Sequence, residues 1–151
     1  MFTATPPLLE HVADLIVRVS APTVVSCSRR VIGINGGEVM GARLHGKILP
    51  GGAEFQVIRA DHTTELDARY VIETHSGALI YVVNTGFRHK PHEKTESQGA
   101  GRIDRSRPDL FALNAAFETD ATDYLWLARN VFVGTAERHP DRVELAIYQL
   151  L

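Results

Sequence analysis

The fold class is decided by residues 49–88, LPGGAEFQVIRADHTTELDARYVIETHSGALIYVVNTGFR. This stretch holds three runs typical of β-strands, in which apolar and β-branched side chains alternate with polar ones. The runs are 53–59, 64–74 and 78–87, and turn signals separate them at Gly51-Gly52, Asp61-His62 and Ser76-Gly77. A spacing of about 10 to 12 residues from turn to turn is typical of sandwiches and barrels rather than of βαβ units.

The rest of the chain predicts further strands and one helical turn. The period of residues 8–19 is ambiguous, but the following Ala21-Pro22 favours a strand. Other strands are expected at 30–35 (closed by a turn at Gly36-Gly37), at 38–49 (bent), at 111–118, and at 130–137 and 143–150 as a last hairpin. Residues 119–128 predict a short helical turn, which Thr119 or Asp120 can cap.

Together these segments predict an all-β fold, a single antiparallel β-barrel of about nine strands over residues 1–151. A closed barrel leaves no strand edge exposed to other chains. The polar segment 89–108 has no hydrophobic period. Such long loops are usually lids, partner contacts or disordered tips.

Composition narrows the functional classes. The 151 residues are 44% hydrophobic and 23% charged, which is ordinary for one globular domain. The net charge of −2 gives no basic excess, so nucleic acid is not an expected partner. No apolar run reaches the roughly 20 residues that span a bilayer, and no signal peptide is recognisable. We therefore expect a soluble, cytoplasmic protein without a membrane partner, associated as a homodimer, the commonest oligomer.

Three motifs agree in order with one protein family. They are GGEVMGARLHGKILPGGAEFQVIRAD from Gly36, ELDARYVIETHSGALIYVVNTG from Glu65, and FETDATDYLWLARNVFVGTAERHPDRVELAIYQL from Phe117. Over roughly residues 30–151 the chain resembles the DUF3237 (UPF0311) family. The resemblance implies a small β-barrel of the calycin-like or allene-oxide-cyclase-like kind, with no established activity.

The chain departs from the pattern of that family at two places. Glu54-Phe55 follows the GGA turn where the family usually shows Asp-Trp. Ala128 stands where the family usually shows the Asn of Trp-Leu-Asn-Arg, and Asn130 could replace that Asn sterically.

Candidate site residues lie at strand spacing among the apolar runs. Asp67 and Arg69 share a face and can form a carboxylate–guanidinium pair, which either braces the barrel or lines a pocket. Asn84 either ties its strand to the next turn or donates into a cavity, where Tyr81 or Tyr70 adds a phenol. Tyr81 and Asn84 lie on opposite faces of a regular strand, so sharing one cavity requires a bulge between them or a place at the barrel mouth for one of them.

The remaining candidates are more open to a structural interpretation. Glu118 is a buried base or a cap, and Arg43 is an anion anchor or an exposed charge. Trp126 is expected to pack as core or as a barrel plug, with stacking on a ligand as the alternative. The predicted catalytic residues are Asp67, Arg69, Tyr81 and Glu118, and the predicted substrate-binding residues are Arg43, Asn84, Trp126 and Asn130.

No metal or cofactor is expected. The seven histidines form no ligand motif, since His89-Lys90-Pro91-His92-Glu93 is interrupted by a proline. The single Cys27 excludes an intrachain disulfide and a cysteine-rich metal site. The glycines form no dinucleotide fingerprint.

Three functions remain open. The first is a small-molecule-binding barrel that acts as a cofactor-independent isomerase, cyclase, lyase or hydrolase on a carbonyl-bearing metabolite. The second is a non-catalytic carrier or sensor, and the third is a structural interaction module with a filled barrel. An open lumen that exposes Asp67 or Glu118 favours the enzyme, and a packed lumen favours the module.

Overall fold

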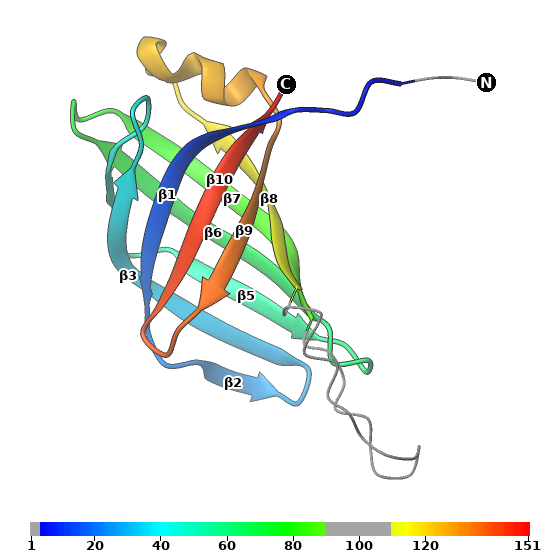
Figure 1. Ribbon diagram of the computed structural model, residues 1–151. Helices are drawn as coiled ribbons and strands as arrows, with labels where there is room; N and C mark the ends of the chain where they lie inside the picture. Colours follow the sequence, from blue (N-terminus) through cyan, green and yellow to red (C-terminus); the bar gives the residue numbers. More distant parts are fainter. Residues whose placement is uncertain (1–3, 90–109) are drawn as a thin grey trace.

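Ten β-strands and one short 3₁₀ helix make up the part of the chain that the structure, a computed structural model, describes: residues 4–89 and 110–151 (Figure 1). The strands are β1 (Leu9–Val19), β2 (Thr23–Ser26), β3 (Arg29–Met40), β4 (Gly46–Ile48), β5 (Ala53–Ile58), β6 (Thr64–Thr74), β7 (Leu79–His89), β8 (Leu110–Glu118), β9 (Phe132–Arg138) and β10 (Arg142–Leu150). The helix η2 spans Thr122–Arg129, between β8 and β9.

The strands close into an antiparallel barrel. The neighbours run in the order β1, β10, β9, β8, β7 and β6, and β6 pairs with both β4 and β5. Both of these pair with β3, and β3 pairs back onto β1. Eight strands form the closed barrel, with β2 and β4 as additions. The predicted fold class is therefore confirmed.

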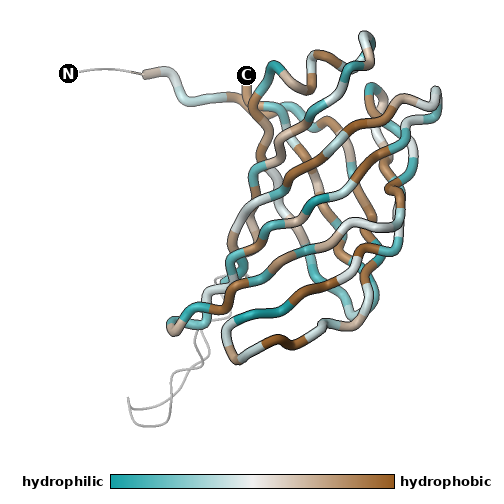
Figure 2. Tube along the Cα trace, turned by 180° about the vertical axis from the view of Figure 1, so that it is seen from behind, coloured by the Kyte–Doolittle hydropathy of each residue, from teal (hydrophilic) through white to brown (hydrophobic). Residues whose placement is uncertain are grey.

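The core lies in the lumen of the barrel and follows strand alternation. In β6, Leu66, Ala68, Tyr70 and Ile72 point inward, while Asp67, Arg69 and Val71 face outward. Figure 2 shows the same alternation as changes of colour along each strand. Because opposite residues on paired strands share a face, the register determines which side chains meet inside.

The helix η2 covers the end of the barrel at which β10 ends (Figure 1). Its Tyr124 and Leu127 are buried, and the Trp126 ring lies 5.9 Å from the ring of Phe132. Phe132 also meets Phe117 edge to face at 5.0 Å. This end of the lumen is packed with apolar side chains, so any cavity must lie nearer the opposite end.

The predicted turn at Gly36-Gly37 is wrong, because β3 continues through both glycines. Their φ angles are +127° and +154°, a region that L side chains rarely adopt. A β-carbon on Gly37 would collide with the carbonyl oxygen of Ile16 in β1. The glycines therefore bend the strand and let it pass from β5 to β4 and β1 without a break. The expected bent strand 38–49 is in turn split by residues 41–45.

The helix begins differently from the prediction. Its N-cap is Ala121, with no side-chain hydrogen bond to the helix, rather than Thr119 or Asp120. Thr119 instead accepts the N–H of Ala121 at 3.1 Å and donates to the carbonyl of Leu79 at 2.8 Å, which ties the entry of the helix to β7. The expected polar loop 89–108 lies outside the described residues, apart from His89 at the end of β7. Within the described ranges, no helix is long and apolar enough to cross a membrane.

Candidate functional site in the barrel lumen

The candidate site is a row of residues across three neighbouring strands, which we call the polar row: Glu54, Ala68 and Asn84. Glu54 lies opposite Ala68, and Ala68 lies opposite Asn84. Glu54 and Asn84 are only 6% and 5% exposed, and both point into the lumen. Neighbouring strands lie about 4.8 Å apart, so the backbones of Glu54 and Asn84 are separated by roughly 10 Å. Only the methyl group of Ala68 stands between the two polar side chains.

A cavity of about 30 Å³ lies at this place in the lumen. Its apolar walls come from β1, β3, β6, β8 and β10, and its polar lining includes Glu54, Asn84 and Tyr70. Neither Asp67 nor Glu118 lines it. A volume of this size holds a water molecule or two. The lumen is thus largely packed, which is the arrangement expected of a structural module, but it keeps a small void with a mainly apolar wall and a few polar groups.

Tyr70 and Asn84 form a hydrogen bond at the wall of this cavity. The amide nitrogen of Asn84 donates to the phenol oxygen of Tyr70 at 2.8 Å, which leaves the phenol hydrogen to donate elsewhere. Burial raises the pKa of Tyr70 well above its usual value, so the phenol stays protonated.

One end of the Asn84 amide has no partner. Its Oδ1 is buried and makes no hydrogen bond with any described residue. Because the two ends of an amide are assigned from hydrogen bonding, a flipped side chain would leave the nitrogen unpaired instead. In either orientation, a buried polar atom at the cavity wall is left to bond with a ligand or water.

The carboxylate of Glu54 has two partners, Gln56 and Arg138. Gln56, which is 1% exposed, donates from Nε2 to Oε1 of Glu54 at 2.9 Å. Arg138 of β9 brings Nη1 to 3.9 Å from Oε2, an ion pair that is too long for a hydrogen bond. The second carboxylate oxygen is therefore oriented by a positive charge and can still accept a hydrogen bond.

The expected convergence of Asp67, Arg69, Tyr81 and Asn84 on one cavity is wrong. The register between β6 and β7 runs from Thr64 to Glu73 without a bulge, so Tyr81 and Asn84 lie on opposite faces. Asp67 and Arg69 are 40% and 51% exposed on the outer wall, joined at 3.1 Å. Hydrogen bonding with Asp67 and then with Tyr81 raises the pKa of Arg69, so these three residues form an outer cluster.

The other predicted residues lie away from the cavity. The guanidinium of Arg43 stacks 3.8 Å from the centre of the Trp126 ring, and Asn130 donates from Nδ2 to the Trp126 carbonyl at 2.7 Å. Glu118 is exposed at the end of β8, opposite Tyr81. None of the four lines the cavity. What these residues contribute to binding or catalysis stays a prediction.

Sequence reasoning missed Glu54 and Gln56 as site residues. Alternation over β5 places them on the face opposite Phe55, and the usual rule would turn the apolar face inward. The structure inverts the strand: Glu54 and Gln56 are buried and Phe55 is 42% exposed. A signal was available, because the family pattern places an acidic residue at the position of Glu54.

No metal centre is formed from the described part of the chain, in which no three His, Cys, Asp or Glu side chains are grouped suitably. His92 and Glu93 lie outside the described residues.

Comparison with known proteins identifies the family. The family model described as "Protein of unknown function (DUF3237)" matches residues 7–150. The chain belongs to the DUF3237 family. A UPF0311 protein of Rhodopseudomonas palustris (strain TIE-1) is 41% identical over 132 residues, which are 87% of this chain and 86% of that protein. A UPF0311 protein of Clostridium acetobutylicum is 34% identical over 146 residues, 93% and 92% of the two chains.

Solved structures share the barrel. The crystal structure of a DUF3237 relative of unknown function from Rhodopseudomonas palustris has a TM-score of 0.86 at 37% identity, covering 99% of this chain and 100% of that one. A β-barrel-like protein from Acinetobacter baumannii has a TM-score of 0.85 at 34% identity, covering 100% of both chains. A structure described as an enzyme from Penicillium herquei has a TM-score of 0.76 at 21% identity, covering 100% and 99%. At that identity the likeness shows the fold alone.

Proposed function

We propose that the barrel lumen binds a small carbonyl-bearing molecule and that Glu54 transfers a proton to and from it. The observation that carries this proposal is the unpaired end of the Asn84 amide, buried at the wall of the cavity. Leaving such a group unbonded is costly, and a ligand atom that bonds with it removes the cost. An apolar cavity with a few convergent polar groups is also the usual form of a small-molecule site.

The polar row divides the chemical roles between its two ends. A ligand carbonyl oxygen accepts one hydrogen bond from this pair. The donor is the phenol of Tyr70, which burial keeps protonated, while the Asn84 nitrogen donates to Tyr70; it is the Asn84 nitrogen when the amide is flipped and its oxygen accepts the phenol hydrogen. The carbon next to that carbonyl then lies over Ala68, within reach of the carboxylate of Glu54. Proton transfer to a placed carboxylate is general base catalysis.

The step moves one proton and two electron pairs. The carboxylate of Glu54 takes the proton from the carbon next to the carbonyl, and the C–H electron pair becomes a C=C bond. The carbonyl π pair moves to the oxygen, where the hydrogen bond from Tyr70 or Asn84 stabilises the negative charge. When the proton on Glu54 is first replaced by one from solvent, its delivery to the same carbon gives exchange, and delivery to a different carbon gives isomerisation. The enzyme of the same fold from Penicillium herquei is compatible with catalysis in such a barrel, but it does not specify this reaction.

A ligand larger than water must displace side chains. Leu66 and Phe111 line the cavity and are 7% and 9% exposed. We expect these two side chains to change rotamer when an aromatic ketone enters.

The test is hydrogen exchange of acetophenone in D₂O, followed by NMR as loss of the methyl signal. The wild-type protein should bind acetophenone and accelerate exchange, and Glu54→Gln should bind it without accelerating exchange. Glu38→Gln, which removes an outward-facing carboxylate on β3, is the matched control and should behave as wild type. Binding without exchange in the wild type would favour the carrier function. Absence of binding would refute the proposal.

A further inference from the structure

We propose that the ligand of this lumen also carries an anionic group, a carboxylate, which Arg30 and Arg138 bind at the end of the barrel opposite η2. This inference rests on the proposed function and adds the chemical class of the ligand to it. The ligand would be an oxo acid, with its carbonyl at Tyr70 and Asn84 and its carboxylate at the two arginines.

Both arginines face the lumen by register. Arg30 lies opposite Gln56, whose side chain is buried inside the barrel, and it has the same parity in β3 as the buried Ile32. Arg138 lies opposite the buried Val143 in β10. Opposite residues on paired strands share a face, so the two guanidinium groups approach the same end of the lumen.

Among the described residues, the inward-facing charges at this end are not balanced. Arg30 makes no ion pair or hydrogen bond within residues 4–89 and 110–151, although its Nε is buried. Arg138 has one acidic partner there, Glu54, at 3.9 Å, and one oxygen of that carboxylate is already bonded by Gln56. Two inward arginines thus share one carboxylate. Arg88 faces the same end, but it has an interaction of its own.

A carboxylate is the group that best satisfies this arrangement. A guanidinium presents paired N–H donors that match the two oxygens of a carboxylate. A partly buried guanidinium without a counterion is costly, so it binds an anion that arrives with a ligand. Neither arginine lines the cavity, but Glu54 connects them to the polar row: it pairs with Arg138, and it accepts a hydrogen bond from Gln56, which lies opposite Arg30.

The test compares two probes of equal shape that extend acetophenone, 4-acetylbenzoate and 4-acetylbenzamide. They differ in charge at the end that should meet the arginines. We expect the acid to bind about tenfold more tightly than the amide, since hydrogen bonds between charged groups are roughly twice as strong as neutral ones. Isothermal titration calorimetry at low salt measures both affinities.

Three variants test where the probes bind and whether the preference for the acid depends on Arg30. Arg30→Gln should remove most of the preference for the acid, and it should fold normally because Arg30 has no partner to lose. Arg18→Gln, an outward arginine that is paired with Glu38, is the matched control and should keep the full preference. Ala68→Leu fills the space between Glu54 and Asn84 and should weaken both probes, which places them in the lumen.

The outcomes separate the two proposals. Equal binding of acid and amide, with acetophenone still bound, overturns the inference and leaves the proposed function standing. A preference that survives both Arg30→Gln and Arg138→Gln also overturns it. If none of the three probes binds, both proposals fall.

Discussion

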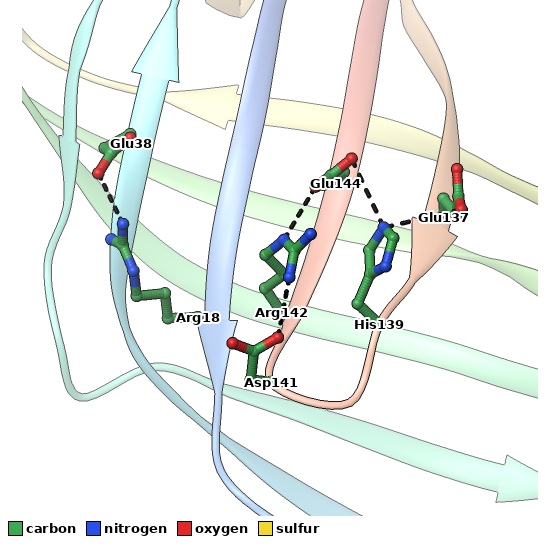
Figure 3. A network of polar contacts seen from close by, with 7 residues as sticks. All are labelled: Arg18, Glu38, Glu137, His139, Asp141, Arg142 and Glu144. Atoms are coloured by element: carbon green, nitrogen blue, oxygen red, sulfur yellow. Dashed lines mark hydrogen bonds and ion pairs between the residues drawn. The ribbon is translucent and has the colours of Figure 1, made fainter.

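Two ion pairs, one inside the barrel and one outside, show how differently the two surfaces use charge. On the outer wall, Arg18 of β1 and Glu38 of β3 meet at 2.7 Å with side chains that are 52% and 49% exposed (Figure 3). In the lumen, Arg138 and Glu54 are separated by 3.9 Å, yet their side chains are only 20% and 8% exposed. We expect the shorter pair to show the weaker coupling, because water screens it, whereas the inner charges have lost most of their hydration.

The outer wall also satisfies its own polar groups. Arg142 donates to Asp141 and Glu144, and this hydrogen bonding lowers the pKa of Glu144 (Figure 3). His139 lies 3.5 Å from Glu144 and 3.7 Å from Glu137. The buried Nε2 of His139 makes no hydrogen bond, but two carboxylates lie close to it. Inside the barrel, the unpaired atoms of Asn84 and Arg30 have neither a hydrogen bond nor an ion pair with any described residue. Closeness and number of ion pairs therefore do not identify the site, whereas buried polar atoms with neither a hydrogen bond nor an ion pair do.

The largest difference between the two surfaces should appear on truncating an aromatic ring. Phe132 is 1% exposed in the lumen, and Phe87 is 45% exposed on the outer wall. Phe132→Ala should lower the free energy of unfolding by about 3–5 kcal/mol, since it leaves a cavity among the rings of Phe117 and Trp126. Phe87→Ala should cost about 1 kcal/mol or less. Urea denaturation measures both, and equal losses would show that the lumen collapses around the missing ring.

The next largest effect on stability should come from breaking the hydrogen bond between Tyr70 and Asn84. Tyr70→Phe should cost about 1–3 kcal/mol in unfolding free energy, because it leaves the Asn84 amide wholly unpaired in a buried place. Adding Asn84→Leu should recover most of that loss, since both partners are then apolar. Urea midpoints of the single and double variants test this. A double variant that is less stable than Tyr70→Phe alone would contradict it.

The same phenol predicts a dependence on pH. Burial raises the pKa of Tyr70 above the value of 10.0 that the unfolded chain shows. The unfolded state therefore loses this proton first, and stability that is complete below pH 10 falls as the pH rises toward the folded pKa. The decline is about 1.4 kcal/mol per pH unit for one group. Tyr70→Phe should flatten this decline and the control Tyr148→Phe should keep it, as measured by urea denaturation between pH 9 and 11.

How far the sequence predicts this molecule depends on whether a feature is local. Alternation in residues 64–74 and 78–87 correctly divides β6 and β7 into two faces and places Tyr81 and Asn84 on opposite ones. The pairing of Asp67 with Arg69 was also predictable, because two residues of one strand at this spacing share a face. The predictions that failed concern residues whose role depends on neighbours that are distant in the sequence. Gly37 was expected in a turn, and only the close approach of Ile16 shows why a glycine is needed within a strand.

The prediction of the site residues failed for a related physical reason. The sequence analysis placed the site on Asp67, Arg69 and Tyr81, because charged and phenolic side chains on otherwise apolar strands are candidates for lining a pocket. Such groups are also stable on an outer surface, and on β6 and β7 they lie exposed on the outer wall. Glu54 becomes a site residue only because closure of the barrel turns the polar face of β5 inward, opposite Ala68.

The smallest expected effect is the coupling between Arg18 and Glu38, which sharpens the contrast with the inner pair. A double-mutant cycle of Arg18→Ala and Glu38→Ala should give a coupling of about 0.5 kcal/mol or less, because the charges are half exposed and two long side chains must be ordered to meet. Raising the salt concentration to 1 M, where the screening length is about 3 Å, should bring this coupling close to zero.

The same cycle with Arg138→Ala and Glu54→Ala should give a larger coupling that salt changes less, since removing one partner leaves a charge in the lumen without its counterion. Equal couplings for the two pairs would mean that water reaches Glu54 freely, and the lumen could then not provide the dry setting on which proton transfer at Glu54 depends.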